Sequence, residues 1–367
     1  MRYFGTDGIR GRVGELLVPL FIERVGRALS QVVGSRTVVI GRDTRESGVW
    51  ICDMLKKAFS NVIDVGIVPT AAVSFLTVHH KAAMGIMVTA SHNPPEYNGI
   101  KIFNPDGSKL GSDDKARIEE LIACPWVERL VSHFKDIKEW PRVAVDCANG
   151  AGAGVTREVF SRLGVSHMLY NTSGEINPKF ELPIGDADIG FAFDGDADRL
   201  TVVGVHGDRL LAALALYLCK RGDSIAVTQM FNMGAEKFLA EHGIGVIRTE
   251  VGDANVAAVI RKHGLRFGGE SSGHIIIPKI HIGGDGLTAA LTVMRMIVES
   301  GKSIDELTRG IPLLPFASAN VPSDVVIKHI ERPGYRIVVR KSGTEPVTRL
   351  YVEGPDERTC KTILNNL

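Results

Sequence analysis

Short apolar runs alternate with stretches of helix length along most of this 367-residue chain, and this alternation limits the folds that it can adopt. The apolar runs predict strands at residues 37–40, 84–88, 142–145, 224–227 and 245–247. The stretches between and after them predict helices at residues 19–33, 49–60, 235–242, 255–263 and 287–300. Strands and helices in alternation indicate an α/β fold built in layers.

The chain is too long for a single ordinary core, so two to four domains are expected. Strand-like restarts at residues 142–146 and 221–225 suggest domain boundaries after Trp140 and near Lys220. A third boundary is expected near Pro315, where the pattern changes to strands. The predicted segments are therefore residues 1–140, 141–220, 221–315 and 316–367.

Composition excludes several classes of protein. Lys and Arg number 43 against 42 Asp and Glu, so no basic surface for nucleic acid is expected. Five scattered cysteines without C-x-x-C spacing favour a reducing cytoplasm over a disulfide framework or a zinc site. The longest apolar run, residues 210–219, is too short to cross a bilayer, and the first residues form no apolar signal segment. We therefore expect a cytoplasmic protein.

A turn-rich loop at residues 89–101 presents Ser91 and Lys101 directly after an apolar run. That run, residues 83–88, predicts a strand buried on both faces, and Asn93-Pro94-Pro95 forbids a helix immediately after the serine. Loops in such places carry chemistry. Many loop serines only make local side-chain turns, so this segment by itself leaves both interpretations open.

The segment at residues 194–199 reads DGDADR and follows the apolar run 189–193. Carboxylates at alternate positions, from Asp194, Asp196 and Asp198, suit Mg²⁺ or Ca²⁺. An EF-hand loop counted from Asp194 would need glycine at Arg199 and glutamate at Val205, so that type of site is excluded. A solvated acidic turn is the alternative, but three like charges this close repel one another without a cation. The motif therefore predicts a metal site.

The segment at residues 268–274 reads GGESSGH and contains a G-x-S-x-G motif around Ser271. Serine hydrolases use this motif at a strand-to-helix elbow, whereas the β-branched run 275–277 and Pro278 predict a strand after it. The hydrolase interpretation is therefore discarded. Alternation along an extended segment would place Glu270, Ser272 and His274 on one side, where they are expected to grip sugar hydroxyls.

The segment at residues 340–349 combines two arginines with hydroxyl groups and a glycine, after a strand-like run at 335–339. Arg340, Ser342, Gly343, Thr344 and Arg349 offer the donors that hold a phosphate. A charged hairpin turn would have a similar sequence. The phosphate site is therefore a hypothesis that depends on the other motifs.

Together and in this order, these segments resemble the loops of the α-D-phosphohexomutase superfamily, and most closely those of its bacterial phosphoglucosamine mutase branch. Residues 3–11, YFGTDGIRG, resemble the N-terminal signature of that branch. Residues 89–101 resemble its phosphoserine loop, and residues 194–199 its metal loop. Residues 269–274 resemble its sugar-recognition loop, and residues 340–349 its phosphate-binding loop. The five motifs span nearly the whole chain.

The resemblance implies three successive α/β domains with mixed sheets of common topology, plus a smaller C-terminal α+β domain, arranged around a central cleft. It assigns the phosphoserine loop to residues 1–140, metal binding to 141–220, sugar recognition to 221–315 and phosphate binding to 316–367. Members of the family are usually longer, and residues 149–194 look too short for the usual helix and strand. The second and fourth domains are therefore expected to be shortened. Ala197, Ser271 and Lys341 stand where glycine, glutamine and proline are common.

The resemblance also implies a role for each site residue. Ser91 carries a phosphoryl group and is one ligand of Mg²⁺, with Asp194, Asp196 and Asp198 as the others. The residues implied in charge stabilisation and proton transfer are Arg10, His92, Lys101, Arg199 and His274. The residues implied in binding the sugar and its non-reacting phosphate are Glu270, Ser272, Arg340, Ser342, Gly343, Thr344 and Arg349.

The implied reaction interconverts glucosamine 6-phosphate and glucosamine 1-phosphate, with a sugar 1,6-bisphosphate as intermediate and activator. Glu270 supports an amino sugar because its carboxylate can pair with a protonated 2-amino group. The expected partner is this hexosamine phosphate, without nucleic acid or membrane, and a homodimer is the oligomer considered. The alternatives are a phosphomannomutase/phosphoglucomutase, a metal-dependent sugar phosphatase with an aspartate nucleophile, and a sugar-phosphate binding module without activity.

Overall fold

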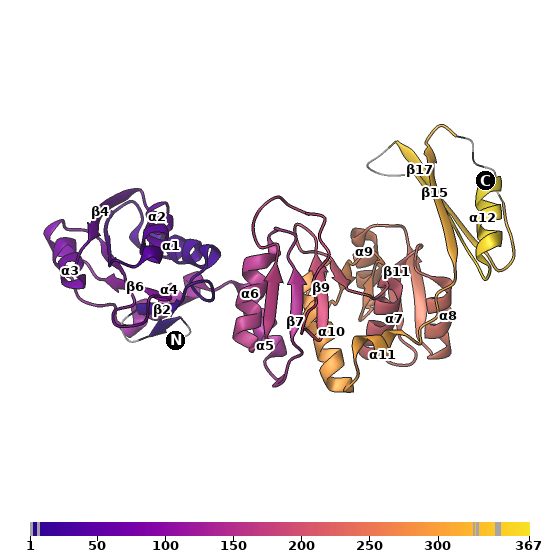
Figure 1. Cartoon of the computed structure of the whole chain (residues 1–367), viewed down its shortest axis with the longest axis horizontal. Helices are drawn as coiled ribbons and strands as arrows, with labels where there is room; N and C mark the ends of the chain where they lie inside the picture. Colours follow the sequence, from indigo (N-terminus) through magenta and orange to yellow (C-terminus); the bar gives the residue numbers. More distant parts are fainter. Residues whose placement is uncertain (1–2, 6–7, 326, 328–329, 342–345) are drawn as a thin grey trace. The chain divides into compact units, whose positions relative to one another are not determined.

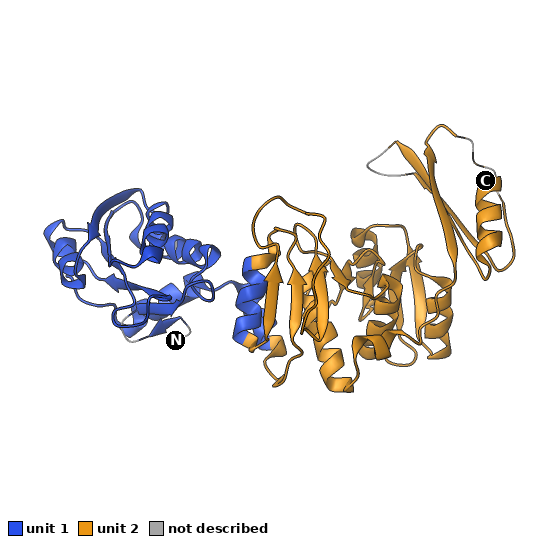
Figure 2. Cartoon of the chain, in the orientation of Figure 1, with its two compact units in different colours: residues 1–132, 154–162 blue, residues 133–153, 163–367 orange. Residues whose placement is uncertain are grey.

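The computed structural model describes residues 3–5, 8–325, 327, 330–341 and 346–367 (Figure 1). Contacts divide the chain into two compact units, which Figure 2 shows in different colours. The first unit comprises residues 1–132 and 154–162, and the second comprises residues 133–153 and 163–367. Strands and helices alternate in both units, so the predicted α/β class is confirmed.

Six strands form the mixed sheet of the first unit, in the order β1-β2-β6-β5-β3-β4. They are β1 (Phe4–Gly5), β2 (Gly8–Arg12), β3 (Thr37–Arg42), β4 (Asn61–Ile67), β5 (Met84–Val88) and β6 (Tyr97–Phe103). Strand β3 pairs in parallel with β4 and β5, and the other pairs are antiparallel. Every residue of β5 is buried, as the apolar run predicted.

Amphipathic helices pack on this sheet. They are α1 (Pro19–Val33), α2 (Glu46–Lys56), α3 (Thr70–His79) and α4 (Ser112–Ile122), whereas α5 (Pro125–Phe134) pairs through Glu128 with Arg162. Helix α1 begins at a proline, whose missing N–H costs nothing at the first helical position. Its buried residues Phe21, Ile22, Val25 and Leu29 recur at helical spacing, and the helix packs against α2 and α4.

The second sheet lies in the second unit and has the strand order β10-β9-β7-β8. Its strands are β7 (Val143–Asp146), β8 (His167–Tyr170), β9 (Ile189–Phe193) and β10 (Leu200–Val202), and α6 (Gly152–Leu163) connects β7 to β8. The expectation that residues 149–194 are too short for a helix and a strand is therefore wrong. Both elements fit because the connections at residues 147–151 and 164–166 are short.

The third sheet has the order β12-β11-β13-β14 and is also mixed. Its strands are β11 (Ser224–Thr228), β12 (Gly245–Thr249), β13 (Gly268–Gly269) and β14 (Ile275–Ile276). The helices of this part of the chain are α7 (Gly207–Leu218), α8 (Met233–Glu241), α9 (Asp253–His263), α10 (Gly286–Ser300) and α11 (Ile304–Thr308).

The three mixed sheets share one pattern of four strands. In each, the first strand pairs in parallel with the second and the third, and the third pairs antiparallel with the fourth. The common topology is therefore confirmed. Three of the motifs occupy the same place in this pattern, between the third and fourth strands: residues 89–96 between β5 and β6, 194–199 between β9 and β10, and 270–274 between β13 and β14.

The C-terminal sheet is antiparallel and has the order β15-β17-β16. It consists of β15 (Phe316–Pro322), β16 (Arg336–Lys341) and β17 (Val347–Glu353), and α12 (Glu357–Asn366) packs against β15 and β17. The start of β15 confirms the change to strands that was expected near Pro315. The domain boundaries and the central cleft stay predictions.

All five cysteines are free thiols, as their scattered positions indicated. Within the described ranges, no helix combines the length and the apolar character that crossing a membrane requires.

Candidate active site

Ser91 lies in the turn that joins β5 to β6, and it is exposed. Its backbone has φ 58°, in the left-handed region, which costs a residue with a β-carbon about 1–2 kcal/mol. The chain turns without forming a helix, as Asn93-Pro94-Pro95 predicted, and Asn93 N donates to Ala90 O at 3.1 Å. The candidate nucleophile is thus displayed on a strained turn after a buried strand.

Two other predicted residues lie on strands beside this turn. The Arg10 guanidinium on β2 donates to Asn93 Oδ1 at 2.8 Å, and the Arg10 backbone pairs with Gly99 of β6. Lys101 lies on β6, opposite Met87 of β5. The structure therefore gathers Arg10, Lys101 and the Ser91 turn on three adjacent strands.

A cavity of about 870 Å³ opens beside Ser91, with Asp43, Arg45 and Asn93 among its lining residues. His92, next to Ser91, is exposed. The roles of His92, Arg10 and Lys101 stay predictions.

The acidic loop between β9 and β10 brings three carboxylates together. Asp194, Asp196 and Asp198 each place one oxygen within 4.8 Å of the others. The Arg199 backbone N–H donates to Asp194 Oδ1 at 3.2 Å, and its guanidinium Nε lies 3.5 Å from Asp194 Oδ2. The loop is therefore folded around its carboxylates, with an arginine at its edge.

The donors of this loop fit a hard cation such as Mg²⁺. Burial raises the pKa of Asp198 above its ordinary value, and the charges of Asp194 and Asp196 raise it further, while His274 opposes them. Asp198 Oδ1 is buried and lies 3.2 Å from His274 Nε2, the group that opposes this rise. A cation bound among the three carboxylates would compensate the repulsion between them. Ser91 as a further ligand stays a prediction.

Backbone contacts hold the acidic loop in place. The Gly286 N–H donates to Ala197 O at 3.0 Å, and a β-carbon on Gly286 would lie 2.4 Å from Arg199 O. A β-carbon on Gly150 would lie 2.1 Å from Gly195 O, so glycine is required there as well. Ala197 itself has φ 61°, a left-handed backbone that glycine would adopt without strain.

The segment at residues 270–274 is a tight turn, not the extended strand that the alternation of Glu270, Ser272 and His274 implied. The Gly273 N–H donates to Glu270 O at 3.0 Å, and the Glu270 N–H donates to His274 O at 2.8 Å, so β13 and β14 form a hairpin. Glu270 and His274 are buried, whereas Ser272 is exposed. The strand after the motif confirms that it is no hydrolase elbow.

Glu270 and His274 meet across this turn and reach the acidic loop. His274 Nδ1 lies 2.7 Å from Glu270 Oε2, and His274 Nε2 lies 3.2 Å from Asp198 Oδ1. The hydrogen bond to Glu270 raises the pKa of His274, although burial opposes it. Burial acts to raise the pKa of Glu270, but the bonds from His274 and from the Gly252 N–H outweigh it and the pKa is lowered. Glu270 is thus a buried carboxylate that keeps its charge.

The two arginines predicted to bind phosphate are neighbours in the C-terminal sheet. Arg340 of β16 and Arg349 of β17 are directly opposite each other in the antiparallel ladder. Both line a cavity of about 360 Å³, together with Asp208 and Ser271. Ser342, Gly343 and Thr344 lie outside the described residues.

Asp208 belongs to this cavity, although no sequence motif marks it. It lies in the first turn of α7 and is buried. Its carboxylate accepts hydrogen bonds from the Ser271 hydroxyl and from the Asn232 N–H, the latter at 3.3 Å. Burial raises the pKa of Asp208, and the bond from Ser271 opposes that rise. Ser271 is therefore bound to α7 through Asp208. Acidic residues are common in the first turn of helices, so the sequence alone does not single out Asp208.

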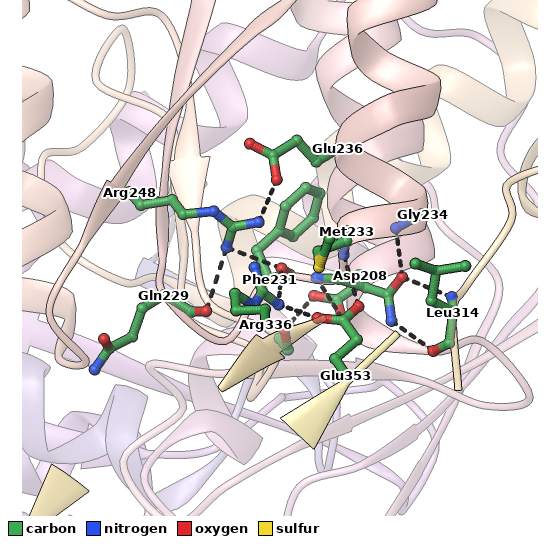
Figure 3. A network of polar contacts seen from close by, with 12 residues as sticks. Asp208, Gln229, Phe231, Met233, Gly234, Glu236, Arg248, Leu314, Arg336 and Glu353 are labelled. Carbon is green, nitrogen blue, oxygen red and sulfur yellow. Dashed lines mark hydrogen bonds and ion pairs between the residues drawn. The ribbon is translucent and has the colours of Figure 1, made fainter. Parts of the chain in front are cut away.

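A buried polar network joins the C-terminal sheet to the segment before α8 (Figure 3). Arg336 of β16 pairs with Glu353 of β17 and donates to Phe231 O at 2.6 Å. Glu353 Oε1 accepts the Met233 N–H at 2.7 Å. The network thus ties β16 and β17 to the segment before α8, in which Met230 and Asn232 line the cavity.

Asn232, in the segment before α8, also binds the residues that lead into β15 (Figure 3). Asn232 Oδ1 accepts the Leu314 N–H at 2.9 Å, and Asn232 Nδ2 donates to Leu314 O at 3.0 Å. Asn232 also caps α8 through the Gly234 N–H. One side chain therefore anchors both the helix and the connection that leads into the C-terminal sheet.

Comparison with known proteins places the chain in a family. Residues 1–124 match the phosphoglucomutase/phosphomannomutase α/β/α domain I, residues 206–313 match domain III, and residues 323–367 match the C-terminal domain. The chain is 37% identical to the phosphoglucosamine mutase of Thermotoga sp. strain RQ2, over 429 aligned residues that cover 100% of the chain and 99% of that protein. The alignment is longer than the chain, so that relative carries segments that are missing here.

Solved structures show the same fold. A phosphoglucomutase/phosphomannomutase family protein from Burkholderia thailandensis is 25% identical with a TM-score of 0.57, covering 99% of this chain and 95% of that one. The N-acetylphosphoglucosamine mutase of Aspergillus fumigatus, solved with GlcNAc-6P and magnesium, is 17% identical with a TM-score of 0.51, covering 100% of this chain and 94% of that one. The chain belongs to the α-D-phosphohexomutase superfamily and is a phosphohexomutase-family enzyme, an intramolecular phosphotransferase.

Proposed function

We propose that the chain interconverts glucosamine 6-phosphate and glucosamine 1-phosphate, as a phosphoglucosamine mutase. The observation that carries this proposal is the 37% identity, over the full length of both proteins, to a phosphoglucosamine mutase. The site supports it, because Glu270 is a buried carboxylate whose lowered pKa keeps it charged. Such a group can pair with the protonated 2-amino group of glucosamine.

Phosphorylated Ser91 donates its phosphoryl group to the free hydroxyl of the bound sugar phosphate. The bond from phosphorus to Ser91 Oγ breaks and a bond from phosphorus to the sugar oxygen forms. Lys101 accepts the proton of the sugar hydroxyl, and the departing Ser91 Oγ takes up one proton to become a free hydroxyl, so the step consumes no net proton. The resulting 1,6-bisphosphate turns over and returns its other phosphoryl group to Ser91, which is then ready for another cycle. Arg10, His92, Arg199 and His274 are proposed to stabilise the transferred charge or to move protons.

Asp194, Asp196 and Asp198 would hold Mg²⁺, together with an oxygen at Ser91. The ion would supply positive charge to the phosphoryl group during transfer. The chain's own contribution is the rigid loop described above, which keeps three carboxylates together and Arg199 beside them.

One phosphate of the substrate does not react and must be held in either orientation of the sugar. Arg340 and Arg349 are proposed for this task, since adjacent guanidinium groups recognise charge rather than one face of a sugar. Ser342, Gly343 and Thr344 are proposed to assist them, and Ser272 to contact the sugar. Arg340→Ala should therefore weaken binding of the 1-phosphate and of the 6-phosphate alike, and an effect on only one isomer would contradict this role.

The four predicted domains are proposed to surround one cleft that closes on the substrate, because water would otherwise hydrolyse the phosphoserine. A sugar 1,6-bisphosphate would act as intermediate and activator. Five free thiols favour a reducing compartment, so the cytoplasm stays the predicted location. A homodimer stays the oligomer considered.

The test compares kcat/KM for the 6-phosphates of glucosamine, glucose and mannose on one preparation. A clear preference for glucosamine is expected, and a preference for mannose or glucose would assign the chain to the phosphomannomutase/phosphoglucomutase branch. Release of inorganic phosphate without isomerisation would indicate a phosphatase. Ser91→Ala should abolish turnover, whereas Ser108→Ala, at another exposed turn serine, should not.

A further inference from the structure

We propose that Arg45 positions Ser91 for phosphoryl transfer; the proposal rests on the function of Ser91 proposed above. Arg45 immediately precedes α2, and its side chain is only 12% exposed. Its guanidinium donates to four backbone carbonyl oxygens of the turn that carries Ser91. These belong to Ser91 at 3.0 Å, Asn93 at 2.7 Å, Pro94 at 2.6 Å and Tyr97 at 3.0 Å.

The same arginine is linked to the other side of Ser91. Arg45 Nε donates to Asp43 Oδ2 at 3.1 Å, and the Thr89 hydroxyl donates to the same oxygen at 2.6 Å. Thr89 Oγ1 in turn accepts the Ser91 N–H at 2.9 Å. Both polar backbone groups of Ser91 are therefore held by side chains that meet at Asp43.

This arrangement explains how Ser91 keeps its unusual backbone. A serine with φ 58° is disfavoured, and such a conformation persists only where the surroundings impose it. Arg45 imposes it by drawing the carbonyl groups of the turn onto one planar group. Without that group the carbonyls would turn to water and Ser91 would relax. Phosphoryl transfer is sensitive to displacements of about 1 Å, so a relaxed Ser91 reacts slowly.

Arg45 acts through the turn and not on the substrate. A guanidinium has five N–H donors, and the five hydrogen bonds of Arg45 to the carbonyls and to Asp43 use all of them. None is left to bind a phosphate, although Arg45 lines the cavity beside Ser91. Lysine cannot replace it, because three donors on one nitrogen cannot reach the same set of oxygens.

The test compares Arg45→Ala and Arg45→Lys with Arg24→Ala. Arg24 is a matched control because its side chain is also 12% exposed and also clamps a backbone carbonyl, that of Ile122, at 2.9 and 2.7 Å. Its partners, Ile122 and Glu158, lie outside the Ser91 turn. The readouts are kcat and KM, the melting temperature, and the rate at which glucose 1,6-bisphosphate phosphorylates Ser91, followed by intact mass.

Both Arg45 variants should lose about 100-fold in kcat and in the rate of Ser91 phosphorylation. Their KM should stay within about twofold, because the substrate is held elsewhere. Added guanidinium ion should restore part of the activity of Arg45→Ala. Arg24→Ala should lower the melting temperature and keep kcat per folded molecule. Equal kcat losses in Arg24→Ala and Arg45→Ala, or a loss confined to KM, would overturn the proposal.

The outcomes also separate this proposal from the proposed function. A wild-type enzyme that isomerises glucose or mannose phosphate but not glucosamine phosphate would refute the substrate, and the variants are then compared on the sugar that reacts. A wild-type enzyme that never becomes phosphorylated on Ser91 would refute the phosphoserine mechanism and the role of Arg45 with it.

Discussion

The buried pair of Arg336 and Glu353 allows a quantitative test of how the C-terminal sheet is held. The two residues are opposite each other on β16 and β17, and the Glu353 side chain is 0% exposed. Burial raises the pKa of Glu353 and lowers the pKa of Arg336, so it opposes the charge on both groups. Removing one partner therefore leaves the other charge in a largely buried place without its ion-pair partner.

Each single change, Glu353→Gln or Arg336→Met, should cost about 3 kcal/mol for opening this part of the structure. The double change removes both charges, and the glutamine oxygen still accepts the Met233 N–H. Phe231 O loses Arg336 but keeps its bond from Arg248, at 2.9 Å. The double variant should therefore cost only about 1 kcal/mol. If the two single changes acted independently, the double variant would instead cost about 6 kcal/mol, the sum of the two single costs.

Hydrogen exchange of the native protein is the suitable assay, because a chain of several units does not unfold in one step. The opening free energy is measured on peptides that cover residues 231–236 and 347–353. Glu357→Gln on α12 removes an exposed ion pair with Lys361 and should leave exchange nearly unchanged. A double variant as costly as the two single variants combined would refute the reasoning, because the charges would then not depend on each other.

Asp196→Asn should weaken Mg²⁺ binding by more than about tenfold in titration calorimetry, since one of three clustered carboxylates loses its charge; unchanged affinity would place the metal elsewhere. Ala197→Gly should raise stability by about 0.5–1 kcal/mol, because glycine adopts φ 61° without strain; a lower melting temperature would contradict this. Cys52, Cys147 and Cys360 are buried, and burial raises the pKa of the half-exposed Cys219 to about 11, so a thiol reagent near pH 8 should label the half-exposed Cys124 first. Peptide mass spectrometry checks the order, and earlier labelling of Cys52 would show that its thiol is accessible.

Local sequence patterns predicted the helices and strands well, because the spacing of apolar residues that distinguishes a helix from a strand involves only neighbouring residues. The helix expected at 19–33 is α1 (Pro19–Val33), and the strand expected at 84–88 is β5 (Met84–Val88). The same reasoning placed Ser91 and the three aspartates on turns after buried strands. Turn formers and charge repulsion act over a few residues, so they too leave a local signal.

Features that depend on distant contacts could not be predicted in this way. The turn at Glu270 closes through a bond to His274 across a hairpin, and alternation alone suggested an extended strand. Asp208 meets Ser271 over a sequence separation of 63 residues, and Arg45 reaches Ser91 over 46. Nothing near these residues in the sequence marks such partners. The positive φ of Ser91 could not be predicted from the sequence either, because a serine does not require a positive φ.

The repeated four-strand pattern has a consequence for the ancestry of this chain. Three sheets that share the same four-strand pairing, each with its motif in the same connection, are what duplication of one ancestral unit would leave. The loop between the third and fourth strands can change in sequence without disrupting the sheet. The hydrogen bonds between the strands hold the sheet together, and the loop is not needed for them. One copy could thus acquire a serine, another a cluster of carboxylates and the third a Glu–His pair, while the scaffold stayed the same. Three chemistries would then have diversified from a single inherited position.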